Sequence, residues 1–242
     1  MSAVYAVVFA DGAAFEDAGG GLPVVFRDLG GVPVVVRTVR QLLAHPEVVR
    51  VVVTCPPAAA DRLAAVLRDG DLDGPVTTVV APVASDEAIH DGLAALQDIA
   101  AEDDVVLIHD AARPLIDQAL ITANIAAARE HAAAVTVGPA TEGVARVVGD
   151  AVVQVHPTDG EMLVLKAPQT FRYGVVWDLY TWAHDSVGVH STSPAHLCRY
   201  SGVKPRAVRG STANIRITDD VDLEVGAVLL AAAGADVAGG RA

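Results

Sequence analysis

The chain has 242 residues, 52% of them hydrophobic, which is enough to bury the core of one α/β domain. A formal net charge of -13 excludes nucleic acid and an anionic membrane as the main partner, because both select for clustered lysine and arginine. No apolar run approaches the roughly 20 residues that span a bilayer, and we expect no signal peptide because a basic leader is not seen. Cys55 and Cys198 are the two cysteines, which are too few for a disulfide framework. We therefore expect a cytoplasmic protein with buried thiols.

Short β-branched runs alternate with alanine- and leucine-rich segments in the first half of the chain, which is typical of βαβ units. The predicted strands are Val4–Ala10, Val48–Thr54, Val76–Val80, Val105–His109 and Ala133–Val137. Apolar residues at helical spacing predict helices over Val34–Ala44, Ala58–Leu67, Ser85–Ile99 and Ala119–Glu130. The pattern therefore predicts an α/β fold with a mostly parallel, twisted sheet.

The alternation stops after Val137. Two β-rich runs, Val144–Val148 and Ala151–His156, are separated by Gly149-Asp150, a two-residue turn that suits a hairpin. We interpret residues 139–160 as an arm that projects from a single domain spanning residues 1–242. A two-stranded hairpin is only marginally stable alone, so we expect the arm to pack against a second copy of the chain. The alternative is a hairpin folded back on its own domain.

After the arm, the remaining predicted elements are a strand Met162–Lys166, a helix Tyr173–His184, a strand Lys204–Val208 and a helix Val221–Ala233. Thr218 or Asp219 would cap the last helix, because both side chains can accept the hydrogen bonds of its first amides. Residues 234–242 are expected to fray, as chain ends commonly do.

The strand Val105–His109 is followed directly by Asp110, two alanines, Arg113 and Pro114. In open parallel sheets, ligands bind beyond the carboxyl ends of the strands. An aspartate there can hold a metal and an arginine can meet a phosphate. The alternative is a solvated ion pair at a strand end.

Three motifs carry a resemblance to a known family: Ile108–Pro114, Ala167–Phe171, and Asn214–Thr218 followed by Asp222-Leu223. In order and spacing they resemble the methylerythritol phosphate cytidylyltransferases, and the resemblance continues through Leu42–Pro46 and the arm. It implies a Rossmann-like nucleotidyltransferase fold and an arm-exchanged homodimer. In that family, CTP and 2-C-methyl-D-erythritol 4-phosphate give the cytidine diphosphate product and pyrophosphate, with magnesium, in isoprenoid precursor synthesis.

The resemblance also implies roles for individual residues. Arg113 and Arg216 would be catalytic, with Arg216 standing where the family has a lysine. The implied nucleotide-binding residues are Ala10, Asp11, Gly12, Ala88 and Asp110. The implied acceptor-binding residues are Asp110, Arg113, Asn214 and Thr218. Asp110 would hold Mg²⁺ only if the CTP phosphates supply the remaining ligands.

The chain departs from the family pattern where the reaction needs positive charge. Attack of a phosphate on the α-phosphorus of CTP brings two anions together, so cations must neutralise them. Glu16 stands where the family has an arginine, and Val24 stands where it has a lysine. Arg27, Arg37 and Arg40 are candidates to replace the lysine, although the last two are also expected to be solvated charges on a helix.

Further positions of the family pattern are altered. Ala81-Pro82 and Ala88 replace a glycine pair and a serine that contact the cytosine ring. Near Gly143 and Asp159 the family has a threonine and an arginine that grip the acceptor phosphate. An acid in place of that arginine reverses the charge.

Two classes of function follow from these residues. The first is an active nucleotidyltransferase, acting on methylerythritol phosphate or with altered nucleotide and sugar- or alditol-phosphate specificity. The second is a catalytically degenerate paralogue that serves as a binding or regulatory protein. Loss of each cation costs roughly 2 to 4 kcal/mol of transition-state stabilisation, so we predict strongly reduced or absent cytidylyl transfer.

Overall fold

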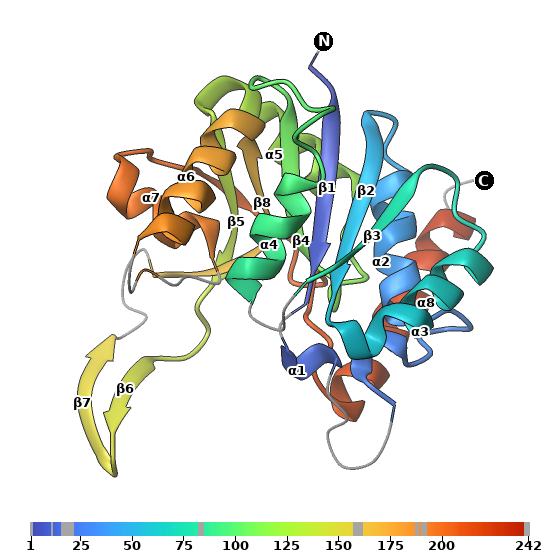
Figure 1. Cartoon of the computed structure of the whole chain (residues 1–242). Helices are drawn as coiled ribbons and strands as arrows, with labels where there is room; N and C mark the ends of the chain where they lie inside the picture. The colour runs from blue at the N-terminus through green and yellow to red at the C-terminus, as the bar shows by residue number, and fades with distance from the viewer. Residues whose placement is uncertain are drawn as a thin grey trace.

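The computed structural model describes residues 2–10, 12–15, 22–81, 85–156, 162–186, 189 and 193–239. Within them, a seven-stranded sheet has the order β3-β2-β1-β4-β8-β5-β9 (Figure 1). Its strands are β1 (Val4–Phe9), β2 (Val48–Cys55), β3 (Val76–Val80), β4 (Val105–Asp110), β5 (Ala133–Pro139), β8 (Leu163–Arg172) and β9 (Arg206–Arg209). All neighbouring strands pair in parallel except β8, which is antiparallel to both β4 and β5. The predicted α/β class with a mostly parallel sheet is confirmed.

The described helices are α1 (Gly12–Phe15), α2 (Val34–Leu43), α3 (Ala60–Asp69), α4 (Ser85–Ala94), α5 (Gln118–His131), α6 (Tyr173–Asp185), α7 (Pro194–Ser201) and α8 (Asp220–Gly239). Short 3-10 turns cover Val24–Phe26 and Pro57–Ala59. The predictions missed α1 and α7. They also ended β8 too early, at Lys166, and ended the last helix at Ala233, whereas α8 continues to Gly239.

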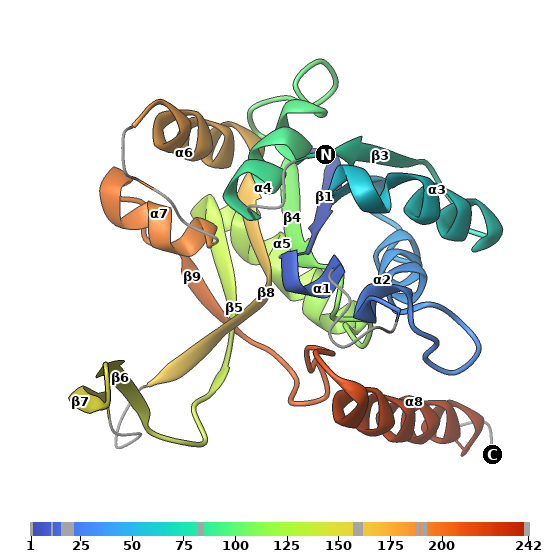
Figure 2. The same ribbon diagram turned by 60° about the horizontal axis from the view of Figure 1, so that its bottom comes forward.

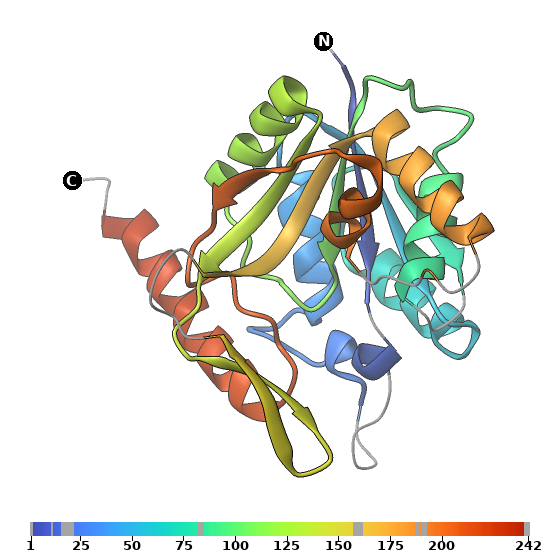
Figure 3. The same cartoon turned by 90° about the vertical axis from the view of Figure 1, so that its left-hand side faces the viewer.

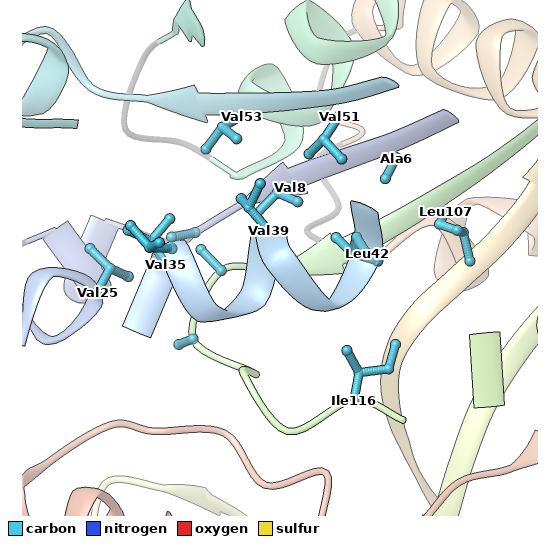
Figure 4. Packing of buried hydrophobic residues seen from close by; sticks show 14 of the residues in the cluster. Ala6, Val8, Val25, Val35, Val39, Leu42, Val51, Val53, Leu107 and Ile116 are labelled. Atoms are coloured by element: carbon cyan, nitrogen blue, oxygen red, sulfur yellow. The ribbon is translucent and has the colours of Figure 1, made fainter. Parts of the chain in front are cut away.

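Alternate residues of the central strands pack into two separate cores, one on each face of the sheet. In β1, Val4, Ala6 and Val8 belong to the core beneath α2, α3 and α5, whereas Tyr5 and Val7 belong to the core beneath α4 and α6. Figure 2 shows these two helical layers on opposite sides of the sheet, and Figure 4 shows Val8, Val39 and Leu42 of the first core. Because both faces are covered, the strands are almost entirely apolar.

The arm consists of β6 (Val144–Val148) and β7 (Ala151–His156), which pair only with each other within the described chain. It extends away from the sheet and its helices (Figures 1 and 3), and every residue of both strands is exposed. Gly149 has a φ of 58°, the left-handed conformation that the predicted turn requires. The hairpin is therefore confirmed, and the alternative of a hairpin folded back on its own domain is wrong.

Among the described helices, none has both the length and the hydrophobicity needed to traverse a bilayer.

Candidate functional site

Asp110 ends β4 and directly opposes Phe9 at the end of β1. Its Oδ1 atom accepts the amide hydrogen of Ala112 at 2.9 Å, which turns the chain sharply out of the sheet. The hydroxyl of Thr38 in α2 donates to the carbonyl of Ala111 at 2.8 Å. Ala111 and Ala112 are completely buried, so the turn accepts only small side chains here. These contacts hold the carboxylate at the carboxyl end of the sheet.

Two arginines meet this carboxylate. Arg216 Nε lies 2.8 Å from Asp110 Oδ2, and Arg113 Nε lies 3.8 Å from the same oxygen. The side chains of Asp110 and Arg113 are only 11% and 14% exposed, so solvent screens their attraction weakly. Burial lowers the pKa of Arg113, an effect that Asp110 opposes and Arg216 reinforces. The structure thus brings together three of the predicted site residues.

The segment containing Arg216 is held against the sheet by backbone and amide contacts. Asn214 is buried, and its Nδ2 donates to the carbonyl of Ala167 in β8 at 2.8 Å. The amide of Ile217 donates to the carbonyl of Ala112 at 2.8 Å, and Arg113 Nη1 donates to the carbonyl of Asn214 at 3.0 Å. Asn214 therefore positions the arginines by fastening its segment to β8.

The hydrogen bonds of Thr218 are made with the start of α8. Thr218 is exposed, and its amide donates to a carboxylate oxygen of Asp222 at 2.8 Å, in the first turn of α8. The side chain of Asp219 accepts the amide hydrogen of Asp222 at 2.9 Å, so Asp219 is the N-cap of that helix. The position of Thr218 favours a structural contribution at the start of α8.

His109, the residue before Asp110, is completely buried and contacts the backbone of Arg113. Its Nε2 lies 3.1 Å from the carbonyl oxygen of Arg113, and because a carbonyl only accepts, this nitrogen carries the proton. Burial lowers the pKa of His109 to about 4, so the imidazole is neutral near pH 7.

Three of the predicted nucleotide-binding positions, Ala10, Gly12 and Ala88, carry no charge. Ala10 is buried just after β1, Gly12 begins α1, and Ala88 is buried on α4. Asp11 and Glu16 lie outside the described residues. Val24, which occupies the family's lysine position, is 7% exposed and packs in the first core. The described part of this loop therefore adds no cation to the site.

The arginines considered as replacements for that lysine are engaged elsewhere. Arg27 pairs with Asp220 and donates to the carbonyl of Leu22. Arg37 donates to the carbonyl of Leu29 at 2.6 Å, and Arg40 donates to that of Gly70 at 2.6 Å. The expectation that Arg37 and Arg40 are solvated charges is wrong, because both are partly buried and satisfy loop carbonyls. None of these contacts favours a replacement.

A pocket of about 120 Å³ opens beside the carboxylate, between the ends of β4 and β8. Its lining consists of Phe9, Ile108, Asp110, Arg113, Leu165, Lys166, Ala167, Gln169 and Pro194. The side chain of Gln169 accepts the amide hydrogen of Ala195 at 2.9 Å, which fastens the start of α7 as a wall of the pocket. Lys166 was not among the predicted site residues. The sequence could have pointed to Lys166 because it is one of the chain's two lysines, the other being Lys204.

The oxygens of Asp110 are already used by protein donors. Oδ1 accepts the Ala112 amide and Oδ2 pairs with Arg216. Among the described residues there is no group of three or more histidine, cysteine, aspartate or glutamate side chains that could hold a metal ion. These residues do not by themselves form a magnesium site, so we derive no chemical step through a metal. What the cluster offers is positive charge for phosphate groups and a carboxylate that can accept from a hydroxyl.

Comparisons with known proteins identify the family of this chain. The model of the 2-C-methyl-D-erythritol 4-phosphate cytidylyltransferase family matches residues 4–232. The chain is 34% identical over 218 residues to a protein of that name from Frankia casuarinae, covering 89% of this chain and 77% of the relative. It is also 28% identical over 229 residues to a ribitol-5-phosphate cytidylyltransferase from Lactiplantibacillus plantarum, covering 94% of this chain and 98% of the relative.

A solved structure shares the fold. The 4-diphosphocytidyl-2C-methyl-D-erythritol synthase of Anaerococcus prevotii aligns with a TM-score of 0.78 at 22% identity, covering 95% of this chain and 98% of that one. Such a likeness shows the Rossmann-like architecture but does not assign a substrate. The family match extends from β1 into α8 and includes the Asp110, Arg113 and Arg216 cluster. This chain therefore belongs to the 2-C-methyl-D-erythritol 4-phosphate cytidylyltransferase family.

Proposed function

We propose that this chain transfers CMP from CTP to a small phosphorylated polyol. A phosphate oxygen of the acceptor attacks the α-phosphorus of CTP, and the bond to the bridging oxygen breaks as pyrophosphate leaves. The observation that carries the proposal is the cluster of Arg113, Arg216 and Asp110 beside a small pocket at the carboxyl end of β4. The arginines would neutralise the reacting phosphates, and Asp110 would hold them in place.

The first candidate acceptor is 2-C-methyl-D-erythritol 4-phosphate, which would place the chain in isoprenoid precursor synthesis. Ribitol 5-phosphate is the alternative, because a relative with that acceptor in its name aligns over 98% of its own length. Both acceptors combine a phosphate with hydroxyls on a short carbon chain. That chemistry suits a pocket lined by the cations of Arg113 and Lys166 together with the carboxylate of Asp110.

A catalytically degenerate binding protein is a second candidate, and the burial of Val24 is the observation that favours it. A lysine there would contribute roughly 2 to 4 kcal/mol to transition-state stabilisation, which is a hundredfold or more in rate. The proposal therefore includes slow turnover. Magnesium, if used, would take its ligands mainly from the CTP phosphates.

The proposal also includes a cytoplasmic homodimer. Cys55 and Cys198 are both buried and free, which fits a reducing compartment. The arm leaves apolar side chains on both strands exposed, including Val147 at 54% and Val153 at 53%, as a pairing surface for a second copy would.

Pyrophosphate release tests the activity. The purified chain is incubated with CTP, ATP, GTP or UTP and with each of the two acceptors, in the presence of magnesium. We expect release that requires CTP and one acceptor, at least a hundredfold slower than in ordinary enzymes of this family. Turnover within tenfold of those enzymes would rule out the degenerate candidate. If release requires ATP, GTP or UTP and does not occur with CTP, that nucleotide would replace CTP as the proposed donor.

Arg216→Met should abolish detectable release, because the variant leaves Asp110 without its 2.8 Å partner and removes one of the two arginines proposed to neutralise the phosphates. Arg206→Met is the matched control, since it removes the same charge from an exposed position on β9. Equal rates for Arg216→Met and Arg206→Met would contradict the assignment of the site. Absence of release under all conditions, together with no nucleotide-dependent rise in melting temperature, would overturn the proposed transferase.

A further inference from the structure

We infer that Lys166 is a phosphate-binding residue of this site and recognises the phosphate monoester of the acceptor. The inference rests on the proposed function and assigns a residue to its acceptor. Lys166 lies just before the motif Ala167–Phe171 and was not among the predicted site residues. It does not stand at the position of Val24, where the family has a lysine. The path of β8 brings Lys166 to the pocket.

The path of β8 changes at this residue. Ile108 in β4 pairs with Gln169, which is the last pair between β4 and β8. On the other side, Val135 of β5 opposes Gln169 whereas Val137 opposes Leu165, so β8 bulges between these pairs. Bulges redirect side chains and are frequent beside active sites. Here the bulge contains Lys166, and the separation of β8 from β4 leaves the pocket that Lys166 lines with Asp110 and Arg113.

Lys166 is partly buried without a matching anion. Within the described residues its ammonium pairs with no carboxylate, and its hydrogen bond to the carbonyl of Ser211 is long, at 3.4 Å. Burial and the neighbouring charge of Arg113 both lower the pKa of Lys166. The carboxylate of Asp110 is paired with Arg216. Among the described residues that line the pocket, Arg113 and Lys166 are therefore two cations beside one carboxylate, in a chain whose formal net charge is -13.

A phosphate monoester matches this excess of charge. It carries nearly two negative charges near neutral pH and accepts several charge-assisted hydrogen bonds. The pocket is small, at about 120 Å³, and it combines charged and apolar walls. Phe9, Ile108 and Leu165 give it apolar walls, and Asp110 can accept from a hydroxyl. The combination selects a small phosphorylated polyol.

Amine labelling of the wild-type protein tests this inference without relying on turnover. Because Lys166 and Lys204 are the chain's two lysines, acetylation at each can be followed by mass spectrometry of peptides. Lys204 is exposed and serves as the internal control. We expect ribitol 5-phosphate or 2-C-methyl-D-erythritol 4-phosphate to reduce acetylation of Lys166 several-fold, with no change at Lys204. Ribitol, which lacks the phosphate, should give no protection.

The probes distinguish the possible sources of the phosphate. Stronger protection by inorganic phosphate than by either polyol phosphate would overturn the acceptor assignment. Protection by CTP alone would assign Lys166 to the nucleotide and would likewise overturn it. Unchanged labelling with every probe would remove Lys166 from the site. Acetylation of Lys166 can be measured even if no pyrophosphate is released. Failure of the proposed transferase and failure of this inference can therefore be distinguished.

Kinetics provide a second test where turnover is measurable. Lys166→Met should raise the KM for the acceptor by roughly 10- to 100-fold, which is the effect of losing one hydrogen bond to a charged group. The KM for CTP should stay within about twofold. Lys166→Arg should recover most of the loss, and Lys204→Met should behave as wild type. A Lys166→Met variant that changes the KM for CTP, or leaves that for the acceptor unaltered, would contradict the inference.

Discussion

At the scale of single residues, the site depends on a neutral histidine behind a charged cluster. His109 is completely buried one residue before Asp110, and it donates a hydrogen bond to the carbonyl of Arg113. Burial disfavours the charged imidazolium and is the main reason that the pKa of His109 is lowered to about 4, and the nearby charge of Arg113 lowers it further. The imidazole thus fixes the backbone of Arg113 without adding charge to the site.

This arrangement predicts a pH dependence of stability. The unfolded chain has an ordinary histidine pKa of 6.5 and the folded chain about 4, so between these values the unfolded chain binds more protons. The free energy of unfolding is therefore highest above about pH 6.5 and falls as the pH is lowered toward 4. His109→Gln keeps a donor for the Arg113 carbonyl but does not titrate.

Urea unfolding at a series of pH values measures the effect. Between about pH 6.5 and 4.5, the loss of unfolding free energy should be smaller in His109→Gln than in wild type by about 2 kcal/mol. His131→Gln, at a partly exposed position, is the control and should follow the wild-type curve. Parallel curves for wild type and His109→Gln would show that the buried imidazole is not the titrating group.

At the scale of elements, the close approach of α4 to the sheet depends on one glycine. Gly92 is buried, and a Cβ added there would lie 2.6 Å from Val7 Cγ1 of β1 and 3.0 Å from Thr54 Cγ2 of β2. Real atoms do not approach so closely, so with any larger residue either α4 or these side chains must shift. The same helix carries Ala88, one of the predicted nucleotide-binding residues.

Gly92→Ala should therefore destabilise the protein by about 1 to 3 kcal/mol, although alanine is the better helix former. The partner variant Val7→Ala removes the closest atom and costs stability by itself. The double variant should be more stable than the sum of the single effects predicts, by about 1 kcal/mol. Urea melts of the four proteins give the coupling. Simple additivity would place the strain somewhere other than at Val7.

At the scale of the whole molecule, the arm exposes apolar side chains on both of its strands. Val148, Val152 and Val155 are 59%, 60% and 61% exposed, on strands that pair only with each other in the described chain. An isolated two-stranded ribbon with this much apolar surface is marginally stable in water. A second copy, contributing the same arm by twofold symmetry, would bury these side chains.

We expect sedimentation velocity to give a dimer for the wild-type chain. The double variant Val147→Asp with Val153→Asp should give a monomer, because it places charges in the proposed interface. The matched control is Val221→Asp with Val228→Asp on α8, where the valines are 66% and 69% exposed. A dimer that persists in the arm variant, or that is lost in the α8 variant, would place the interface elsewhere.

Much of the fold could be predicted because its signals are local. A strand covered on both faces is a continuous apolar run, as in Val105–Ile108, and a helix beside it repeats with its own period. The turn at Gly149 was visible because only particular residues accept a left-handed backbone. The antiparallel direction of β8 could not be predicted, because side chains alternate along a strand in the same way whichever direction it runs.

The sequence alone was also sufficient for the family, because short motifs in a fixed order identify it, and those motifs contain Asp110, Arg113 and Arg216, which the structure brings together. Only the tertiary structure decided which cations reach the pocket. Val24 is buried in the core, Arg37 and Arg40 hold loop carbonyls, and a bulge in β8 brings Lys166 beside Arg113. The physical reason is that charge acts over a few ångströms in space, whereas a sequence orders its residues only along the chain.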